Sequence, residues 1–322
     1  MTSSNKQRSV ATWVGLALFL LLLLVPVWGY TAGQTFYVAF FARIVIYAVA
    51  VVALNLALGF GGLISLGHAL FLGLGSYSVA LPAFYGIDNG WLHLLIAVGS
   101  CAVVGLITGA ISLRTTGIGF IMITLAFAQM GYFLFVSLKQ YGGDDGTSIS
   151  NTSQFFGLNL GNVYTVYIVS LLLLILATWW TARLRAAPFG MVLRGARQNA
   201  RRVNAVGFPS RRYLLASYVI SAIICGIAGL LLANLNAFAS PSTLSWVISG
   251  DLVVMLVLGG LGTVFGPLFG AFAFLGLEEI LKMFTTHWMA IFGLVIVMIG
   301  LLGRAGIVGF FESMSKPRKG NV

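Results

Sequence analysis

One segment interrupts a long apolar stretch with residues suited to handling a small solute. Residues 58–69 read LGFGGLISLGHA, with four glycines, a serine and a histidine. Glycine inside a helix costs about 1 kcal/mol relative to alanine, and a polar group at membrane depth needs a protein or water partner. Transporters commonly build solute sites from the exposed backbone of such broken helices. We therefore expect Gly61, Gly62, Ser65 and His68 to lie on a translocation path, with close helix packing as the alternative interpretation.

A second segment is strongly basic and amphipathic. Eight arginines and no acidic residue lie between positions 183 and 212. Pro188 favours the start of a helix, and Gly207 followed by Pro209 favours its end, so we expect a helix over about residues 189–206. Apolar side chains gather on one face of this helix and arginines on another. The helix either docks into a groove of a cytoplasmic partner or lies on lipid headgroups. The residues expected to couple it to such a partner are Phe189, Gly190, Arg194, Arg197, Arg201 and Gly207.

The remaining reactive residue types form no recognisable catalytic or metal-binding pattern. The sequence has no Gly-x4-Gly-Lys-Ser/Thr phosphate loop and no Gly-x-Ser-x-Gly elbow. His68, His93 and His287 lie in separate segments, and the two cysteines lie within apolar stretches without ligand spacing. We therefore expect no enzyme activity, no metal and no cofactor. Any ATP chemistry must come from partner subunits.

The elements that position these segments are membrane helices. The chain is 59% hydrophobic and 8% charged, with a mean hydropathy of +1.01, whereas soluble domains have roughly 25% charged residues. A spanning helix needs about 20 mostly apolar residues, and the continuous apolar runs lack the alternation of a membrane β-barrel. We expect an all-α, polytopic transmembrane helical bundle. The apolar windows, about ten in number, are residues 12–30, 36–58, 63–85, 92–113, 118–138, 163–181, 214–236, 252–264, 268–283 and 288–302.

The number of spans and their orientation follow from two further patterns. Windows 252–264 and 268–283 are short and joined by a glycine-rich stretch, so eight spans is the alternative count. The first window is expected to be a retained span rather than a cleaved signal peptide. All basic residues except Arg43, Lys139 and Lys282 fall in segments assigned to the inner side when the amino terminus is inside. We therefore expect both termini to be cytoplasmic.

This topology also explains the net charge of +11. Basic residues on the inner side attract anionic membrane lipid, and we expect no binding of nucleic acid. We expect one transmembrane permease domain over residues 1–322, with a cytoplasmic coupling loop at 183–212 and a cytoplasmic tail at 305–322.

Two other features leave alternatives open. The expected outer loop at 140–162 is rich in glycine, aspartate, serine and asparagine. It either gates the path, meets an extracytoplasmic partner, or is a solvated connector. The sequence of residues 56–62 partly recurs at 256–262, with two leucines and two glycines at matching positions. This similarity indicates an internal repeat or arises by chance.

Three stretches together resemble the branched-chain amino acid permeases of ABC importers, the LivM type. They are residues 55–77, 189–208 and 257–271. The resemblance implies a permease subunit of the bacterial inner membrane that moves branched-chain amino acids, or similar small amino acids and amides. It also implies a second homologous permease, two cytoplasmic ABC ATPase subunits and a periplasmic solute-binding protein as partners. The alternative is a stand-alone secondary transporter or channel for a small solute.

Overall fold

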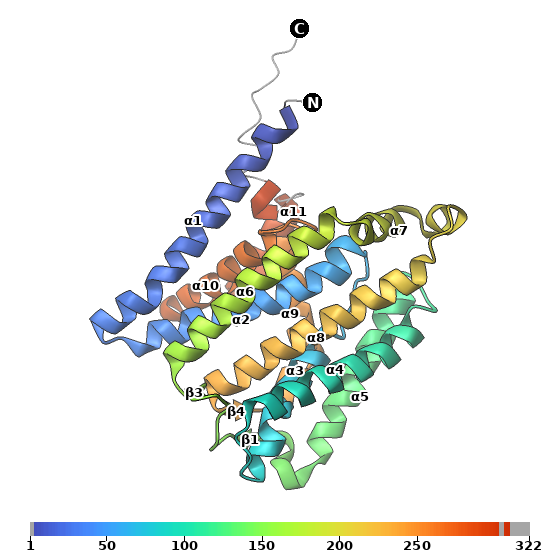
Figure 1. Ribbon diagram of the computed structural model, residues 1–322. Coiled ribbons are helices and arrows are strands. Elements are labelled where there is room, and N and C mark those ends of the chain that lie inside the picture. The colour runs from blue at the N-terminus through green and yellow to red at the C-terminus, as the bar shows by residue number, and fades with distance from the viewer. Residues whose placement is uncertain (1–2, 303–305, 310–322) are drawn as a thin grey trace.

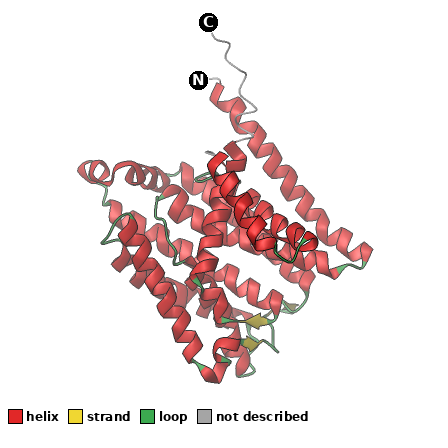
Figure 2. Cartoon of the chain, turned by 180° about the vertical axis from the view of Figure 1, so that it is seen from behind, coloured by secondary structure: helices red, strands yellow, loops and turns green. Residues whose placement is uncertain are grey.

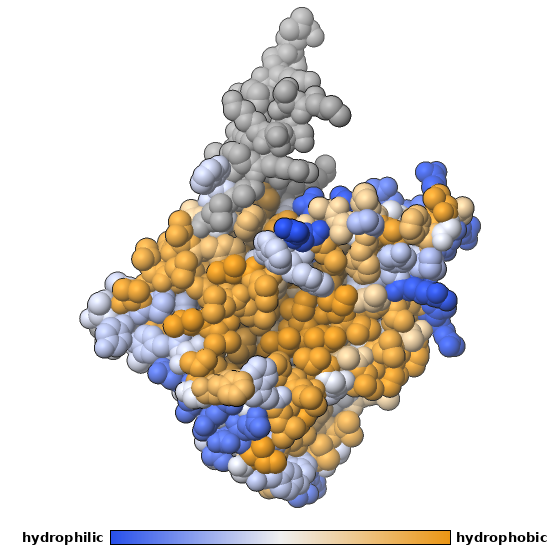
Figure 3. Space-filling view, viewed as in Figure 1, coloured by the Kyte–Doolittle hydropathy of each residue, from blue (hydrophilic) through white to orange (hydrophobic). Residues whose placement is uncertain are grey.

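The chain folds into a bundle of long apolar helices. The computed structural model describes residues 3–302 and 306–309. Within this part of the chain, six helices are long and apolar enough to cross a membrane. The surface of the bundle has a broad apolar belt between two more hydrophilic ends (Figures 1 and 3). The expectation of an all-α membrane protein is confirmed. The six are α1 (Ser3–Ala32), α2 (Thr35–Leu54) with its extension η1 (Asn55–Phe60), α4 (Gly90–Ser112), α5 (Ile118–Ser137), α6 (Val163–Ala186) and α8 (Ser210–Asn236).

Shorter helices occupy the other four apolar windows. These are α3 (His68–Phe84), α9 (Trp246–Gly259), α10 (Gly266–Phe284) and α11 (Trp288–Leu302). A Cβ at Gly259 would overlap the Gly266 carbonyl oxygen, and one at Gly270 would overlap the Met255 carbonyl oxygen. α9 and α10 are therefore two helices packed as a hairpin. Each apolar window thus contains a helix, while the count of ten spans stays a prediction.

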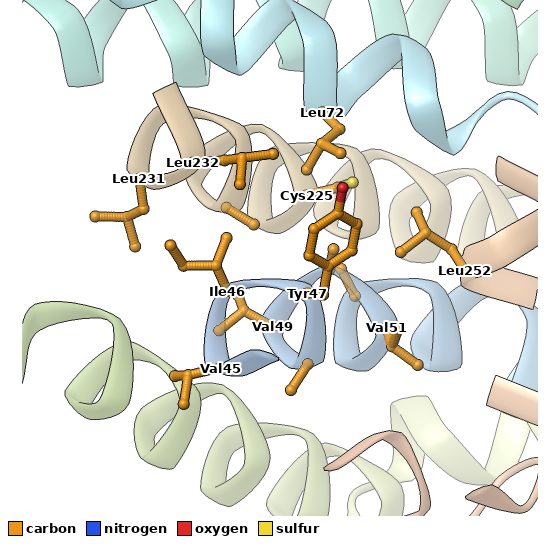
Figure 4. Close-up of a cluster of buried hydrophobic side chains, with 14 of the residues drawn as sticks. Val45, Ile46, Tyr47, Val49, Val51, Leu72, Cys225, Leu231, Leu232 and Leu252 are labelled. Carbon is orange, nitrogen blue, oxygen red and sulfur yellow. The ribbon is translucent and has the colours of Figure 1, made fainter. Parts of the chain in front are cut away.

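The centre of the bundle is α2. From Ile44 onward its sequence is apolar on all sides, and every residue from Ile44 to Leu54 is buried, as expected for a helix surrounded by others. It contacts α6, α8, α9 and α10. Figure 4 shows this core, with Val45 directed toward α6 and Ile46 toward the leucines of α8.

Glycines allow α3 and α8 to approach closely, and these two helices share the most extensive contact in the bundle. A Cβ at Gly75 would overlap the carbonyl oxygen of Gly226, and one at Gly229 would overlap that of Leu72. Small residues at such positions favour association of membrane helices, because the backbones can then pack tightly.

A proline in α1 creates the contact that ties this helix to α6. Pro26 lies inside α1 and has no N–H, so the carbonyl of Leu22 loses its usual donor four residues later. The hydroxyl of Tyr167 on α6 donates to that carbonyl at 2.6 Å. This bond satisfies a backbone group at membrane depth, where no water replaces it.

The two ends of the bundle differ in structure (Figures 1 and 2). The α7 end carries the helix α7 (Pro188–Ala205) and the beginning of α1. The strand end carries two small ladders, β1 (Thr147–Ser148) with β4 (Phe238–Ala239) and β2 (Gln154–Phe155) with β3 (Leu158–Asn159). It also carries the 3-10 helices η2 (Lys139–Tyr141), η3 (Gly143–Asp145) and η4 (Pro241–Leu244).

The expected outer loop lies at the strand end and is fastened to the bundle. Ser153 N–H donates to the side chain of Asn234 at 2.8 Å, and the Ser153 hydroxyl lies 2.7 Å from Nδ1 of His93. These contacts join the loop to α8 and α4. Of the expected tail at 305–322, only residues 306–309 belong to the described part of the chain.

Candidate translocation and coupling site

The predicted break lies between α2 and α3. The π-helix η1 continues α2 to Phe60, and α3 begins at His68. Gly62 has a φ of +73°, a left-handed conformation that glycine adopts without strain. The N–H of Leu63 donates to the carbonyl of Ala57 at 3.1 Å. Gly61 is buried against Ala57 and Leu214, whereas Gly62 is exposed.

Side chains of neighbouring helices satisfy the backbone of the break. Leu66 N–H donates to Thr124 of α5 at 3.3 Å, and Ala69 N–H donates to Ser249 of α9 at 2.8 Å. Ser65 accepts from Gly67 N–H at 3.1 Å. Buried backbone groups need such partners, so the break is held in one defined shape by two helices.

His68 and Ser65 belong to a buried polar network with α8. Nε2 of His68 lies 2.8 Å from the hydroxyl of Ser221, which donates to the carbonyl of Ala53 at 2.5 Å. Because that hydroxyl proton points to Ala53, Nε2 of His68 must be the donor. The hydroxyl of Tyr218 interacts electrostatically with the side chains of Ser65 and Thr108. His68 and Ser65 are both 0% exposed, so neither faces an open passage in this conformation.

Asn55 joins the break to the loop between α9 and α10. Its side-chain amide donates to the carbonyl of Thr263 at 2.8 Å and accepts from Gly262 N–H at 3.0 Å. Gly59 lies against Gly262, since a Cβ added at Gly59 would be 2.9 Å from the backbone nitrogen of Gly262. The two segments of similar sequence, residues 56–62 and 256–262, therefore lie side by side.

The basic helix α7 contacts the same break. The guanidinium of Arg197 donates to the carbonyl of Gly59 at 2.5 Å, and the carbons of the Arg197 side chain lie beside the exposed Gly62. Leu193 is fully buried with Leu56 and Phe60 of η1. The two sets of residues that the sequence singled out thus meet at the α7 end.

The other predicted coupling residues have different surroundings. Phe189 packs on Tyr213 with ring centroids 5.6 Å apart, and Gly190 leaves no room for a Cβ beside the carbonyl of Leu184. Arg194 donates to the carbonyls of Gly190 and Arg185 at 3.3 and 3.2 Å. Gly207 follows the helix with a φ of +97°, as expected of a helix stop. Arg201 is exposed.

α7 is bent, which the sequence pattern did not predict. Its bounds agree with the expected helix at 189–206, but Asn199 has φ −159° and ψ 98°. The side chain of Asn199 accepts from Arg202 N–H at 3.1 Å, so it caps a second helical segment. Asparagine side chains often compete in this way with the helical backbone. An asparagine within the predicted helix was therefore the one sequence signal of the bend.

The bend forms an open groove with a volume of about 610 Å³. Val206, Phe208 and Met191 line it and are 76%, 43% and 55% exposed. Arg202 contributes a charge to the same groove. Apolar side chains exposed beside arginines are typical of a surface that binds another protein.

Comparison with known proteins identifies the family. The family described as "Branched-chain amino acid transport system / permease component" matches residues 36–301. The chain belongs to this permease family. The permease is 28% identical to the high-affinity branched-chain amino acid transport system permease protein LivM of Escherichia coli strain K12, over 85% of this chain and 70% of that protein. It is 26% identical to the fructose import permease protein FrcC of Rhizobium meliloti, over 79% and 74%. It is 23% identical to LivH of Escherichia coli strain K12, over 80% and 91%. No solved structure matches the chain.

Sequence reasoning about the permease missed the partners of the break. Asn55 and Ser221 lie in apolar runs, and Tyr218 reads as a core aromatic. A polar side chain within a spanning helix was the signal available at these positions, because it must find a partner at membrane depth.

Proposed function

We propose that this permease carries branched-chain amino acids, or similar small amino acids and amides, across the bacterial inner membrane in an ABC importer. Cytoplasmic ATPases bind at α7, a second homologous permease completes the path, and a periplasmic binding protein delivers the solute. The hydrogen bond from Arg197 to Gly59 carries the proposal, because it links the basic helix directly to the break. The names of the LivM and LivH relatives support the substrate class.

The mechanism begins at the groove of α7. An ATPase that seats an apolar side chain between Met191 and Val206 moves α7 when its own conformation changes. Arg197 and Leu193 transmit this movement to η1, and Asn55 transmits it to the loop between α9 and α10. The break then shifts, and the polar network around His68 and Ser65 rearranges to open the path. Packed elements with two discrete arrangements carry such transitions.

The exposed face of α5 suits a second permease. α5 is the least buried of the six long helices. Gln129 lies about halfway along it, half-buried and without a hydrogen-bond partner among the described residues. An amide facing acyl chains at that depth is unfavourable, so this face supports pairing with another permease.

Exposed Ala126 on the same face of α5 gives the test. Ala126→Cys should react with a maleimide in the lone permease and be protected after assembly with the companion permease. Equal labelling in both states would reject this face.

The alternative, a stand-alone secondary transporter, depends on acidic residues in the helices. Glu278 pairs with Lys282 at 2.6 Å, whereas Asp251 is half-buried, has no salt bridge among the described residues, and interacts electrostatically with Glu278. Glu279 is also half-buried and has no salt bridge in the described part of the chain, so Asp251 and Glu279 are the acids available to carry a proton. Uptake by the purified chain, driven by an ion gradient without ATPases, would favour this alternative.

The main test separates docking from transmission. Val206→Glu places a charge in the groove, so ATPase co-purification and uptake should both be lost. Arg197→Ala preserves the groove but removes the bond to Gly59, so co-purification should persist while uptake falls about tenfold, as expected for a hydrogen bond to a charged group.

Arg201→Ala is the matched control, since it removes an arginine of α7 whose side chain is exposed. Uptake per assembled complex should fall for Arg197→Ala and not for Arg201→Ala. Uptake at the wild-type level in Arg197→Ala, or an equal loss in both variants, would contradict transmission through Gly59.

A further inference from the structure

The hairpin of β2 and β3 at the strand end carries a strained aromatic tip. Phe156 is 93% exposed and has a φ of +43°, and Gly157 follows with a φ of +89°. A two-residue turn of this kind favours asparagine, aspartate or glycine at its first position. A bulky residue in the left-handed region is unusual. Phenylalanine therefore stands where backbone strain and water both disfavour it.

The tip extends an aromatic group at the beginning of α4. Trp91 packs edge-on against Phe155 and Phe156, with ring centroids 5.3 and 5.6 Å apart. Trp91 is itself 51% exposed. Leu158, at the end of the same turn, is also exposed. Four apolar side chains thus form one surface, called here the aromatic tip: Trp91, Phe155, Phe156 and Leu158.

The aromatic tip continues the exposed stripe of α4. Leu95 and Val103 are 70% and 59% exposed and follow Trp91 at helical spacing along one side of this long apolar helix. That side faces lipid if α4 crosses the membrane. Trp91 marks the end of the stripe, where a spanning helix meets the membrane surface.

Hydrogen bonds fix the position of the hairpin. Gln154 N–H donates to the carbonyl of Asp88 at 2.8 Å, and Thr152 donates to the side chain of Asn159 at 2.8 Å. Gly90 packs under the ring of Phe155 and has no room for a Cβ. Residues 149–162 contain no charged residue. The tip is therefore held at one height beside α4 by an uncharged loop.

We propose that the aromatic tip inserts into the headgroup boundary of the membrane leaflet at the strand end and anchors the loop there. Tryptophan and other amphipathic aromatic rings favour this boundary, where one part of the ring is apolar and another is wet. Insertion removes Phe156 from water and so offsets the strain of its backbone. The anchor does not depend on the substrate or on the ATPases.

Spin labelling of the full-length permease in phosphatidylethanolamine and phosphatidylglycerol vesicles tests the proposal. Leu158→Cys gives a label site within the tip, and Asn151→Cys gives an exposed control site in the same loop. Native Cys101 and Cys225 are both 0% exposed and stay unlabelled. The label at 158 should collide more with oxygen than with a water-soluble nickel chelate, and the label at 151 should show the reverse.

Phe156→Asn tests the role of the tip residue itself. Asparagine suits the turn, so the hairpin should remain folded while the label at 158 becomes more accessible to the nickel chelate. If Phe156 is retained and the label at 158 is as accessible to the nickel chelate as the label at 151, the proposal is overturned. The tip would then be a surface for a soluble protein. No effect of Phe156→Asn on a lipid-exposed label would remove Phe156 from the anchor.

Discussion

The bond between Tyr167 and Leu22 predicts a specific energetic coupling between α1 and α6. Tyr167→Phe removes one hydroxyl and leaves the Leu22 carbonyl without a donor, because Pro26 cannot supply one. An unsatisfied buried polar group costs about 1–3 kcal/mol, while hydrogen bonds between membrane helices average about 0.6 and reach about 1.7 kcal/mol. We expect a loss near the upper membrane value, about 1.5 kcal/mol.

Pro26→Ala restores an N–H four residues after Leu22. In that background the carbonyl has a helical donor, so Tyr167→Phe should cost less than about 0.6 kcal/mol, the average for membrane hydrogen bonds. The double-mutant cycle should therefore give a coupling energy of about 1 kcal/mol. Reversible unfolding of the purified permease in mixed detergent micelles, followed by tryptophan fluorescence, measures it.

Tyr164→Phe is the matched control on the same helix. Its hydroxyl has no hydrogen-bond partner among the described residues, although its ring packs against Tyr30. This substitution should leave the free energy of unfolding unchanged within about 0.5 kcal/mol. The reasoning fails if Tyr167→Phe costs the same with proline and with alanine at position 26, or costs no more than the control.

Two further predictions concern the packing of the break and of α3. Asn55→Leu removes both hydrogen bonds to the loop between α9 and α10 and should lower the free energy of unfolding by about 1–3 kcal/mol; stability equal to wild type in the same detergent assay would refute this link between the break and the loop. Gly75→Ala forces a Cβ onto the Gly226 carbonyl and should cost about 1–3 kcal/mol, whereas Gly99→Ala, which has open space around it in α4, should cost nothing and stabilise by up to about 1 kcal/mol. Equal thermal stability of these two alanine variants would contradict the close approach of α3 and α8.

The sequence allowed the helices and the break to be predicted, but not how they fit together. Apolar length alone located each helix, and the glycines of residues 58–69 located the break, because both signals act within a few residues along the chain. Pro188 and Gly207 likewise gave the bounds of α7. These are local effects of backbone geometry.

The contacts of the candidate site are long-range and leave no such local signal. Arg197 and Gly59 are 138 positions apart, and nothing in either segment names the other as its partner. The bend at Asn199 depends on whether one amide side chain caps the following turn or points to solvent. The periodic pattern of apolar residues is nearly the same in both cases, so it predicts the helix and not the bend.

A hydrogen bond to a main-chain oxygen affects which substitutions can break the contact between α7 and the break. Arg197 binds the carbonyl of Gly59, an atom that every amino acid possesses. Exchanging the residue at 59 therefore leaves the acceptor in place, and such a variant acts by crowding the side chain of Asn55 and the backbone nitrogen of Gly262. A screen for broken communication between α7 and the break should return many substitutions at 197. Those at 59 should instead lower the stability of the folded permease, because a Cβ there crowds Asn55 and the Gly262 nitrogen and leaves the acceptor unchanged.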